Sequence, residues 1–531
     1  MSNTAGCRKP DYSTSSDWKT ASKNRTVAVG LFLIQGGATM FEAAELEKSL
    51  TKEEFDSIEP ELRTQLLDVQ HRLKSSNLSV LVIIAGVDGS GKGDTINLLH
   101  EWMDPRFLMT TAFGSPSAEE KSRPEYWRYW RKLPPKGRTG VFFGSWYTQP
   151  IVQRLNKENS KPDFERAIRR INDTEKMLVD DKTLIVKFWL HISKDAQKTR
   201  FKKLESNKKT SWRVTKEDWK HHRQYDRFIK IAGRMIHETS TAEAPWTLID
   251  AKDEQWRNVS VAKNLIEKIN SRLEIEAAKP PHKVRPMPEP KVVPMTILDS
   301  LDMTKKIERD DFKSEYKELS GRLNSLCRKA KAKGISCVLA FEGMDAAGKG
   351  GAIRRIATAL DARDYRIIPI AAPTSEELAQ QYLWRFWRYM PPSGKITIFD
   401  RTWYGRVLVE RVEGFARKED WQRAYSEINA FERQLFEDGV VFVKYWLHID
   451  ADEQLRRFKA REATPWKQFK ITEEDYRNRE KIKQYLVAVN EMVERTSTEF
   501  APWTLIEAND KLYGRIKVMK TFCEQLEKAL D

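Results

Sequence analysis

The chain of 531 residues contains one pattern twice, and this repetition constrains the fold more than any other feature. A glycine-rich stretch, GVDGSGKGD, begins at Gly86 and a similar stretch, GMDAAGKGG, begins at Gly343, so the offset is 343 − 86 = 257 residues. The same offset relates Trp246 to Trp503 near the end of each copy. A period of this length is too long for a solenoid repeat. The sequence therefore predicts two homologous domains with little net insertion.

A proline-rich segment separates the two copies. Residues 277–296, AAKPPHKVRPMPEPKVVPMT, contain six prolines and should form an extended, fairly stiff connector rather than a helix. We therefore expect a first domain over residues 40–276 and a second domain over residues 297–531.

The first 39 residues differ in character from the residues after them. A short apolar run after Lys23 and Arg25 superficially resembles a signal peptide. The alternative is that Met40 is the natural start, since the sequence becomes charged and typical of a helix directly after it. We prefer the second interpretation, and expect residues 1–39 to be a poorly ordered extension.

In each copy an apolar stretch leads into the glycine-rich loop, and a helical pattern comes after the loop. LSVLVIIAG and ISCVLAFEG are typical of buried parallel strands, and GDTINLLHEW and GAIRRIATAL are typical of the next helices. Residues 472–496 should form one long helix opened by Thr472. The predicted fold class is α/β, with two tandem P-loop domains of three layers, parallel sheets and helical lids.

The second loop has the spacing of a phosphate-binding loop with one substitution. Gly343, Gly348 and Lys349 fit the pattern Gly, four residues, Gly-Lys, but Gly350 replaces the serine or threonine whose hydroxyl normally holds Mg²⁺. Backbone N–H groups and the positive end of the next helix favour phosphate there, and Lys349 adds a full charge. We expect phosphate contacts from the loop residues Gly343, Ala346, Ala347, Gly348 and Gly350.

Two carboxylates are candidates for holding a metal near this loop. Asp345 lies inside the loop, where it could cap the next helix, or replace the absent hydroxyl by holding Mg²⁺ or orienting a phosphate acceptor. Asp400 ends the apolar strand ITIFD, as magnesium-linked acidic residues do in such folds. Arg401 and Arg406 come after it, and both are suited to charge developing on a transferred phosphoryl group.

Two further stretches allow more than one interpretation. YLWRFWRYMPP alternates aromatic and basic residues, which suggests nucleic-acid binding, but helical spacing favours a packed aromatic stripe with Arg385 and Arg388 directed towards the site. RRFKAREATPWKQFK is either a solvated helix end or a mobile basic lid over an anion. Its candidate cations are Arg457, Arg461, Lys467 and Lys470.

Composition narrows the partners and the chemistry. The chain carries 93 Lys and Arg against 77 Asp and Glu, for a net charge of +16, which indicates either polyanionic partners or a well-solvated basic surface. Four cysteines without a CxxC pair suit a reducing compartment. The eight histidines form no ligand cluster, so a metal here should be held by oxygen. No stretch reaches the length of a membrane span.

The motifs GMDAAGKGG, WRFWRYMPPSG and FDRTWYGRVLVERV, with the basic segment after them, resemble those of the type-2 polyphosphate kinase family. The resemblance spans nearly all of both domains, and the tandem pair is similar to the polyphosphate:AMP phosphotransferases of that family. It implies a thymidylate-kinase-like fold, a requirement for Mg²⁺, and transfer of a terminal phosphate from inorganic polyphosphate to AMP, giving ADP.

The resemblance also implies roles for individual residues. Asp345, Lys349, Asp400 and Arg401 would carry catalysis, with Asp345 and Asp400 holding the metal and the lid cations contacting polyphosphate. With the composition, it leads us to expect a cytoplasmic homo-oligomer with neither nucleic acid nor membrane as partner.

The two copies are unequal at the positions that matter for this chemistry. The offset places Phe143 at the position of Asp400 and Gly144 at that of Arg401, whereas Asp88 and Lys92 are kept. Other replaced positions are Gln149 for Arg406, Gln153 for Glu410, Leu204 for Arg461 and Thr210 for Lys467. We therefore expect the first domain to be a scaffold that retains at most anion binding, and the second to be catalytic.

Two rival functions stay open from the sequence. One is a polyphosphate-dependent nucleoside diphosphate kinase, which would use ADP or GDP as acceptor. The other is a nucleic-acid-binding P-loop protein, against which stands the absence of a basic low-complexity tail or of a second stacking motif.

Overall fold

The structure is a computed structural model, which describes residues 40–279, 285–291, 296–471 and 473–531. The expected extension, residues 1–39, lies outside this described part of the chain, as does Thr472. The side chain of Lys470 is likewise not described.

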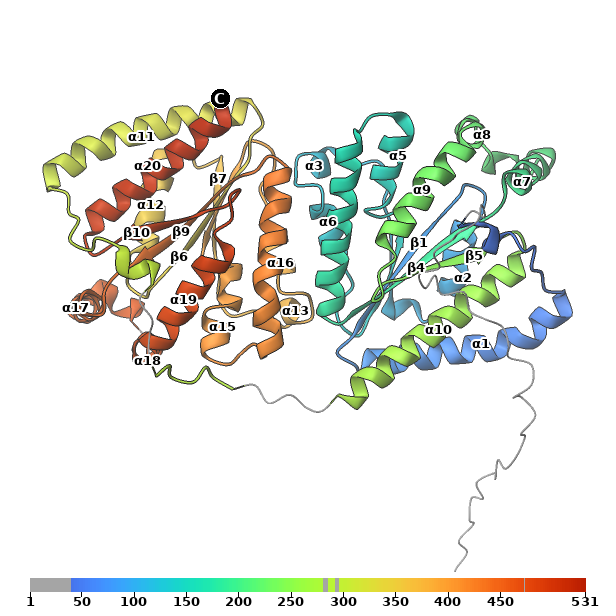
Figure 1. Ribbon diagram of the computed structural model, residues 1–531, viewed down its shortest axis with the longest axis horizontal. Coiled ribbons are helices and arrows are strands. Elements are labelled where there is room, and N and C mark those ends of the chain that lie inside the picture. The colour runs from blue at the N-terminus through green and yellow to red at the C-terminus, as the bar shows by residue number, and fades with distance from the viewer. Residues whose placement is uncertain (1–39, 280–284, 292–295, 472) are drawn as a thin grey trace, which may run out of the picture.

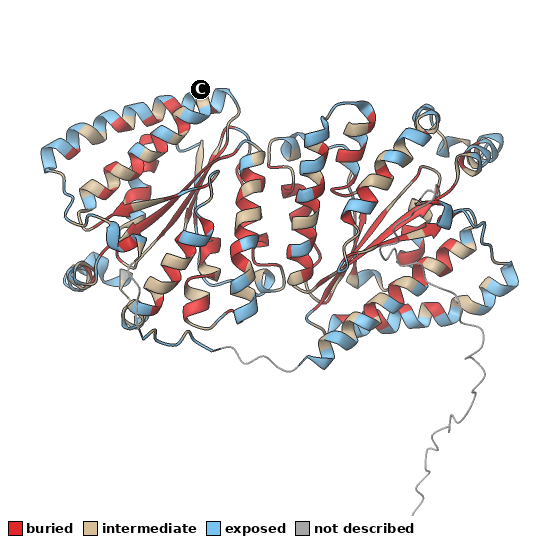
Figure 2. Ribbon diagram, viewed as in Figure 1, coloured by how far each residue is buried: buried red, intermediate tan, exposed pale blue. Residues whose placement is uncertain are grey.

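Each domain is built on a parallel sheet of five strands, in the orders β2-β3-β1-β4-β5 and β10-β9-β6-β8-β7. The strands of the first sheet are β1 (Ser79–Gly86), β2 (Leu108–Ala112), β3 (Thr139–Phe143), β4 (Thr183–His191) and β5 (Trp246–Asp250). Those of the second are β6 (Cys337–Gly343), β7 (Tyr365–Pro369), β8 (Ile396–Asp400), β9 (Val441–His448) and β10 (Trp503–Glu507). The central strands are buried on both faces, as apolar parallel strands require (Figure 2).

Helices cover both faces of each sheet, which gives the predicted three layers and confirms the α/β fold class (Figure 1). The first domain contains α1 (Lys52–Lys74), α2 (Lys92–Trp102), α3 (Ala118–Lys121), α4 (Trp127–Trp130), α5 (Thr148–Asn156), α6 (Lys161–Asp180), α7 (Lys194–Ser206), α8 (Lys216–Arg223), α9 (Tyr225–Thr239) and α10 (Glu254–Ala278). The second contains α11 (Arg309–Ala332), α12 (Lys349–Ala359), α13 (Ser375–Leu378), α14 (Trp384–Trp387), α15 (Val409–Val412), α16 (Lys418–Glu437), α17 (Ala451–Glu462), α18 (Glu473–Glu480), α19 (Ile482–Thr496) and α20 (Lys511–Leu530).

Two expectations about element limits were wrong. Helix α10 continues to Ala278, so the connector starts slightly later than residue 277. The single helix expected over residues 472–496 is two helices, α18 and α19, because Lys481 adopts φ −97° and ψ 21° between them. The break allows α18 to lie against the glycine-rich loop, where Asn478 reaches Asp345.

The two domains pack against each other through equivalent faces. The N–H of Lys136 donates to the carbonyl of Ala379 at 2.8 Å, and the N–H of Ser393 donates to the carbonyl of Ser122 at 2.6 Å. These bonds exchange roles under the sequence offset, since 136 + 257 = 393 and 122 + 257 = 379. The contact is therefore isologous, like that of a two-fold symmetric dimer, although it lies within one chain.

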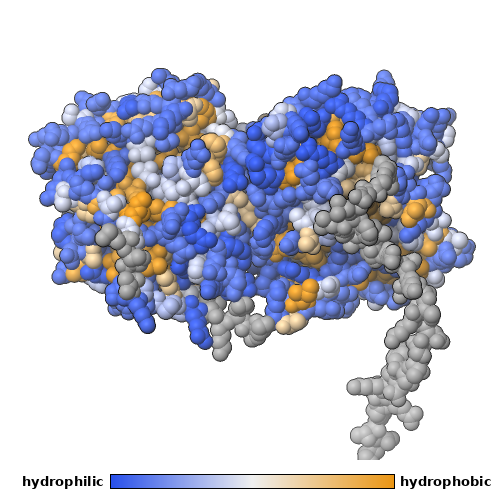
Figure 3. All heavy atoms as spheres, viewed as in Figure 1, coloured by the Kyte–Doolittle hydropathy of each residue, from blue (hydrophilic) through white to orange (hydrophobic). Residues whose placement is uncertain are grey.

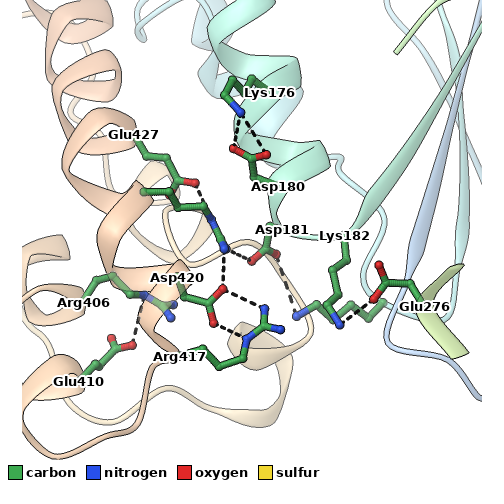
Figure 4. Close-up of polar contacts among 12 residues, drawn as sticks. Lys176, Asp180, Asp181, Lys182, Glu276, Arg406, Glu410, Arg417, Asp420 and Glu427 are labelled. Carbon is green, nitrogen blue, oxygen red and sulfur yellow. Dashed lines mark hydrogen bonds and ion pairs between the residues drawn. The ribbon is translucent and has the colours of Figure 1, made fainter. Parts of the chain in front are cut away.

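Aromatic and charged groups extend this pseudo-symmetric contact. Trp130 stacks on its own counterpart, Trp387, with ring centroids 5.7 Å apart. Beside them, α16 and α6 face each other (Figure 1), and Asp181 at the end of α6, labelled in Figure 4, pairs with Arg423 of α16 at 3.5 Å. The interface combines a buried aromatic centre with charged edges, as interfaces between folded partners commonly do.

Hydrophilic side chains cover most of the face shown in Figure 3, in keeping with the high content of charged residues. Within the described part of the chain, no helix combines the length and apolar character needed to cross a bilayer.

Candidate active site

The loop between β6 and α12 has the backbone geometry of a phosphate cradle. Gly343 adopts φ 154°, and a Cβ there would lie 2.6 Å from the carbonyl oxygen of Leu447, so only glycine fits. Gly348 precedes the first turn of α12 with φ 111°. The strand delivers the loop to the carboxyl edge of the sheet, where the N-terminus of α12 and its backbone N–H groups favour an anion.

Lys349 is held at the base of the loop with donor capacity to spare. Its Nζ donates to the carbonyl oxygens of Gly343 at 2.6 Å and Met344 at 3.3 Å. No other described residue accepts a hydrogen bond from this ammonium group, which can donate three. A Cβ added at Gly350, the position of the absent hydroxyl, would meet no heavy atom within 4 Å.

Asp345 and Asp400, the two candidate metal ligands, line the same cavity. Asp345 accepts a hydrogen bond from Asn478 Nδ2 at 2.9 Å, and it does not cap α12, whose N-cap is Gly348. No described residue donates a hydrogen bond to the carboxylate of Asp400. Among the residues the structure describes, no three histidine, cysteine, aspartate or glutamate side chains gather into a metal site. Two carboxylates without histidine suit Mg²⁺, which prefers oxygen ligands and keeps waters and substrate phosphates.

Arg401 stands between these carboxylates and the neighbouring pocket. Its backbone has φ 65°, its side chain is about half exposed, and its guanidinium lies 3.5 Å from Asp345. Glu342, at the end of β6, accepts hydrogen bonds from the N–H and hydroxyl of Thr402 at 2.7 and 2.8 Å. Glu342 therefore braces the turn that projects Arg401.

Sequence reasoning missed Glu342, although a charged residue at the end of an apolar strand was a visible signal. Burial raises the pKa of Glu342 above its usual value, against the opposing effects of Lys349 and Thr402.

Two cavities meet at this point. The first, called the apolar pocket, has a volume of about 100 Å³ and includes Leu408, Val409, Trp446 and Tyr485 in its walls. The second, called the basic groove, has a volume of about 690 Å³. Both are lined by Asp345, Lys349, Arg401 and Glu474. Groups bound in the two cavities would therefore meet at the loop lysine.

The basic groove contains cations that were not predicted. Arg354 and Arg355, in the helix directly after the loop, line it together with Arg461 and with Arg515 of α20. The arginine pair in GAIRRIATAL was visible in the sequence, but Arg515 is distant in sequence and is brought in only by the packing of α20 beside α12.

Arg457 does not lie in the groove, contrary to the expectation of substrate contact. It is 3% exposed and donates to the loop carbonyls of Ala346 and Ala347, both at 2.9 Å. It also donates to the carbonyls of Ala508 and Asn509 at 2.6 and 2.9 Å. A guanidinium engaged by four carbonyl oxygens holds the loop in place rather than binding an anion.

Arg406 is also absent from the described residues that line the two cavities. Its Nε pairs with Glu410 at 3.2 Å and its guanidinium stacks over Tyr382, on the side facing the other domain (Figure 4). This placement differs from the predicted role in binding substrate, because the 3₁₀ helix Trp403–Arg406 brings Gly405 to the wall of the apolar pocket while its contacts with Glu410 and Tyr382 hold Arg406 elsewhere.

Of the other predicted lid cations, one lines the basic groove and one is exposed to solvent. Arg461 lines the basic groove, and Lys467 is exposed on the short helix Pro465–Lys470, beside Trp466 and Phe469. The expectation for Lys470 concerns a side chain that lies outside the described residues.

The aromatic stripe is part of the core, since Trp384 and Trp387 are 7% and 1% exposed. Arg385 donates to the carbonyl of Ala371, while Arg388 pairs with Glu376. Neither of these buried tryptophans is therefore open to a base, which weighs against the nucleic-acid interpretation of this stretch.

Comparison with known proteins agrees with this geometry. The family model described as Polyphosphate kinase 2 (PPK2) matches residues 49–277 and 306–531. A polyphosphate:AMP phosphotransferase of Pseudomonas aeruginosa is 48% identical over 92% of this chain and 99% of its own length. One from Pseudomonas syringae pv. tomato is 47% identical, with 92% and 99% covered. A crystal structure of a polyphosphate kinase 2 from P. aeruginosa superposes with a TM-score of 0.83 at 46% identity, again covering 92% and 99%.

Proposed function

The chain belongs to the polyphosphate kinase 2 family, and we propose that it transfers the terminal phosphate of inorganic polyphosphate to AMP, giving ADP. The observation that carries this proposal is the meeting of the basic groove and the apolar pocket at Lys349, Asp345 and Arg401. We assign the chemistry to the second domain, because only this domain has both carboxylates.

The basic groove fits the donor. A polyphosphate chain carries about one negative charge per phosphate, so it needs a long row of cations rather than a pocket for a base and a ribose. Arg354, Arg355 and Arg515 supply such a row at the entrance to the loop. A nucleotide donor would place its base in this groove, which offers few apolar walls.

The apolar pocket fits the acceptor. Trp446, Leu408 and Val409 form walls suited to a base, and Arg401 and Lys349 stand at the end where the phosphate of AMP would lie. With α18 docked through Asn478, the pocket is narrow. Entry of AMP therefore requires α18 to move outward, as a lid does.

The transfer needs positioning more than acid–base chemistry. A phosphate oxygen of AMP attacks the terminal phosphorus, the bond to the bridging oxygen breaks, and that oxygen leaves on the shortened polyphosphate. Lys349 and Arg401 place positive charge where the transferred group accumulates negative charge. Glu342 fixes the turn of Arg401, and Arg457 fixes the loop.

We propose Mg²⁺ as the metal, with Asp345 and Asp400 as the residues that hold it. When bound it would neutralise donor oxygens and orient the terminal phosphate. Cytoplasmic location, assembly into a homo-oligomer and the absence of nucleic-acid or membrane partners stay predictions from the sequence.

A phosphate-transfer assay tests the function directly. Long-chain polyphosphate is incubated with Mg²⁺ and each of AMP, ADP, GMP and GDP, and the products are separated by chromatography. We expect ADP from AMP, no product with ATP as the donor to AMP, and loss of product when EDTA is added. Faster phosphorylation of ADP or GDP than of AMP would identify a nucleoside diphosphate kinase instead.

A further inference from the structure

The first domain contains a cavity at the position of the apolar pocket. It has a volume of about 530 Å³, within the roughly 300–1,000 Å³ typical of small-molecule sites. Adding 257 to the numbers of more than half of its wall residues returns residues of the apolar pocket, and adding it to Ala112, Phe113 and Phe143 returns residues of the basic groove. Among these pairs are Trp189 with Trp446, and Val152 with Val409. The domain has therefore kept the pocket and enlarged it, rather than filled it.

The enlargement results from specific replacements. Gly144 stands where Arg401 projects into the pocket of the second domain, and Phe228 replaces Tyr485. Phe143, at the position of Asp400, is 36% exposed and lines the cavity together with Phe113. The metal position has thus become part of an aromatic wall, which favours a planar ring and excludes a hydrated cation.

The end of the cavity nearest the glycine-rich loop is polar, but its hydrogen bonds differ from those of the second domain. Lys92 donates all three of its N–H bonds, to the carbonyls of Gly86 and Val87 and to Asp88, at 2.9 to 3.2 Å. His221, in place of Asn478, lies 2.8 Å from the other oxygen of Asp88. The carboxylate is therefore compensated from two sides.

The net charge at this end of the cavity favours an anion. His221 is 44% exposed and its pKa is raised chiefly by its hydrogen bond to Asp88. Lys220, on the same helix, also lines the cavity, and the facing acidic groups are Asp88 and Glu217. Lys220 donates to Glu217 at 3.0 Å, so with His221 protonated the cations Lys92, Lys220 and His221 exceed the carboxylates of Asp88 and Glu217 by one positive charge.

The donor side has been lost in the same domain. The positions of Arg354, Arg355, Arg461 and Arg515 are taken by Asn97, Leu98, Leu204 and Asn258. These four positions therefore offer a polyanion no cation, so a donor chain would lack the arginines that line the basic groove.

We propose that the first domain binds a nucleoside monophosphate, with the base against the aromatic walls and the phosphate at His221 and Lys220, and does not phosphorylate it. The ligand class rests on the proposed function, since it is taken from the acceptor of the equivalent pocket. The site would be an acceptor pocket without the arginines that bind the polyphosphate donor in the second domain.

Calorimetric titration of the full-length chain with AMP, in the absence of polyphosphate, tests the proposal. Val152→Trp places an indole in the cavity of the first domain from a half-exposed helical position and obstructs it, and the matched Val409→Trp does the same in the apolar pocket. We expect two AMP sites per chain in the unchanged protein, one in each single variant, and none in the double variant. Adenosine should bind the first-domain site at least about 10-fold more weakly than AMP, because it lacks the charge-assisted bonds.

The outcomes separate the two proposals. A single AMP site that Val409→Trp removes and Val152→Trp leaves unchanged overturns the inference while the proposed acceptor pocket stands. A site removed only by Val152→Trp supports the inference and contradicts the acceptor pocket of the second domain. No AMP binding in the unchanged protein overturns both.

His221→Ala provides a second variant on an exposed helix, where folding is not at stake. It should weaken AMP binding at the first-domain site about 10-fold in the Val409→Trp background. It should also remove the strengthening of binding as pH falls through the pKa of His221. Unchanged affinity and an unchanged pH profile would place the phosphate elsewhere and overturn the assignment.

Discussion

The two domains share the same buried polar network in their cores, but they differ in the residues at the carboxyl ends of their strands. In the second domain Lys444 is fully buried, donating to Glu432 at 2.7 Å and to the hydroxyl of Tyr404 at 2.8 Å. In the first domain the equivalent Lys187 donates to Glu175 and Tyr147 at 2.6 and 3.0 Å. A buried charge of this kind must keep its partners, so the whole network is kept in both copies.

The differences lie where strands end at the site. Asp400 and Arg401 become Phe143 and Gly144, and Glu342 becomes Ala85. In the motif FDRTWYGR the Asp-Arg pair, which we propose for the chemistry, therefore differs between the copies, whereas the Trp-Tyr pair belongs to the scaffold that both keep. The comparison teaches that the buried networks shared by the copies report folding, whereas the departures at the strand ends mark where the two sites differ.

The largest expected effect separates the two loop lysines. Lys349→Ala should lower turnover by about 100- to 1,000-fold, because it removes a positive charge at the transferred phosphate. Lys92→Ala should retain most of the turnover, since the first domain has no second carboxylate. Steady-state assays of both variants, with folding checked by circular dichroism, make the measurement. Equal losses would break the division between the domains.

The two arginines that hold the glycine-rich loops, Arg457 and Arg200, should affect stability equally in the two domains. Arg200 in the first domain donates to the carbonyls of Gly89 and Lys252, as Arg457 does to its own loop. Arg457→Ala and Arg200→Ala should each lower the free energy of unfolding of their domain by about 3 kcal/mol, because buried carbonyls lose their donor. Scanning calorimetry measures this loss. Only Arg457→Ala should also impair turnover, and stability unchanged in both would refute the assigned support role.

A smaller effect should distinguish the donor from the acceptor. Arg461→Ala should raise the KM for polyphosphate about 10-fold, since one charged contact is lost, and should leave the KM for AMP nearly unchanged. Arg456, exposed on the same helix and paired with Glu453, provides the matched control variant, Arg456→Ala. If both variants behaved alike, Arg461 would be part of a solvated helix end rather than of the groove.

The smallest effect concerns the position of the absent hydroxyl. Gly350→Ser and its counterpart Gly93→Ser place a side chain where no heavy atom lies within 4 Å of the added Cβ. Each should change the free energy of unfolding by less than about 0.5 kcal/mol. Transfer from polyphosphate should persist in Gly350→Ser. A large loss of stability in thermal unfolding would show that the loop demands glycine at this position for packing.

Much of the fold could be predicted because it depends on local patterns and on the repeat. The offset from Gly86 to Gly343 aligns β3 with β8 and α6 with α16 residue for residue. The positions of Asp400 at a strand end and Asp345 in the loop could also be predicted, because the sequence sets where they lie relative to a strand and a helix. The interruption at Lys481 was not, because helix propensity is nearly uniform there and the bend is stabilised by a contact with Asp345.

The basic residues were harder to assign than the acidic ones. Arg457 and Arg461 lie one helical turn apart, yet one supports the loop from within and the other lines the groove. Sequence spacing places both near the site, but only the packing of α17 against the loop decides which guanidinium meets backbone carbonyls. Arg515 entered the site through tertiary packing alone.

The isologous contact between the domains has a consequence for the halves taken separately. Because Trp387 stacks on its own counterpart, a C-terminal half expressed alone would present a face that is complementary to itself. Tethering places the N-terminal half beside this face at a millimolar effective concentration, so it outcompetes a second chain at ordinary protein concentrations. The first domain would therefore cover this face and oppose self-association of the C-terminal half.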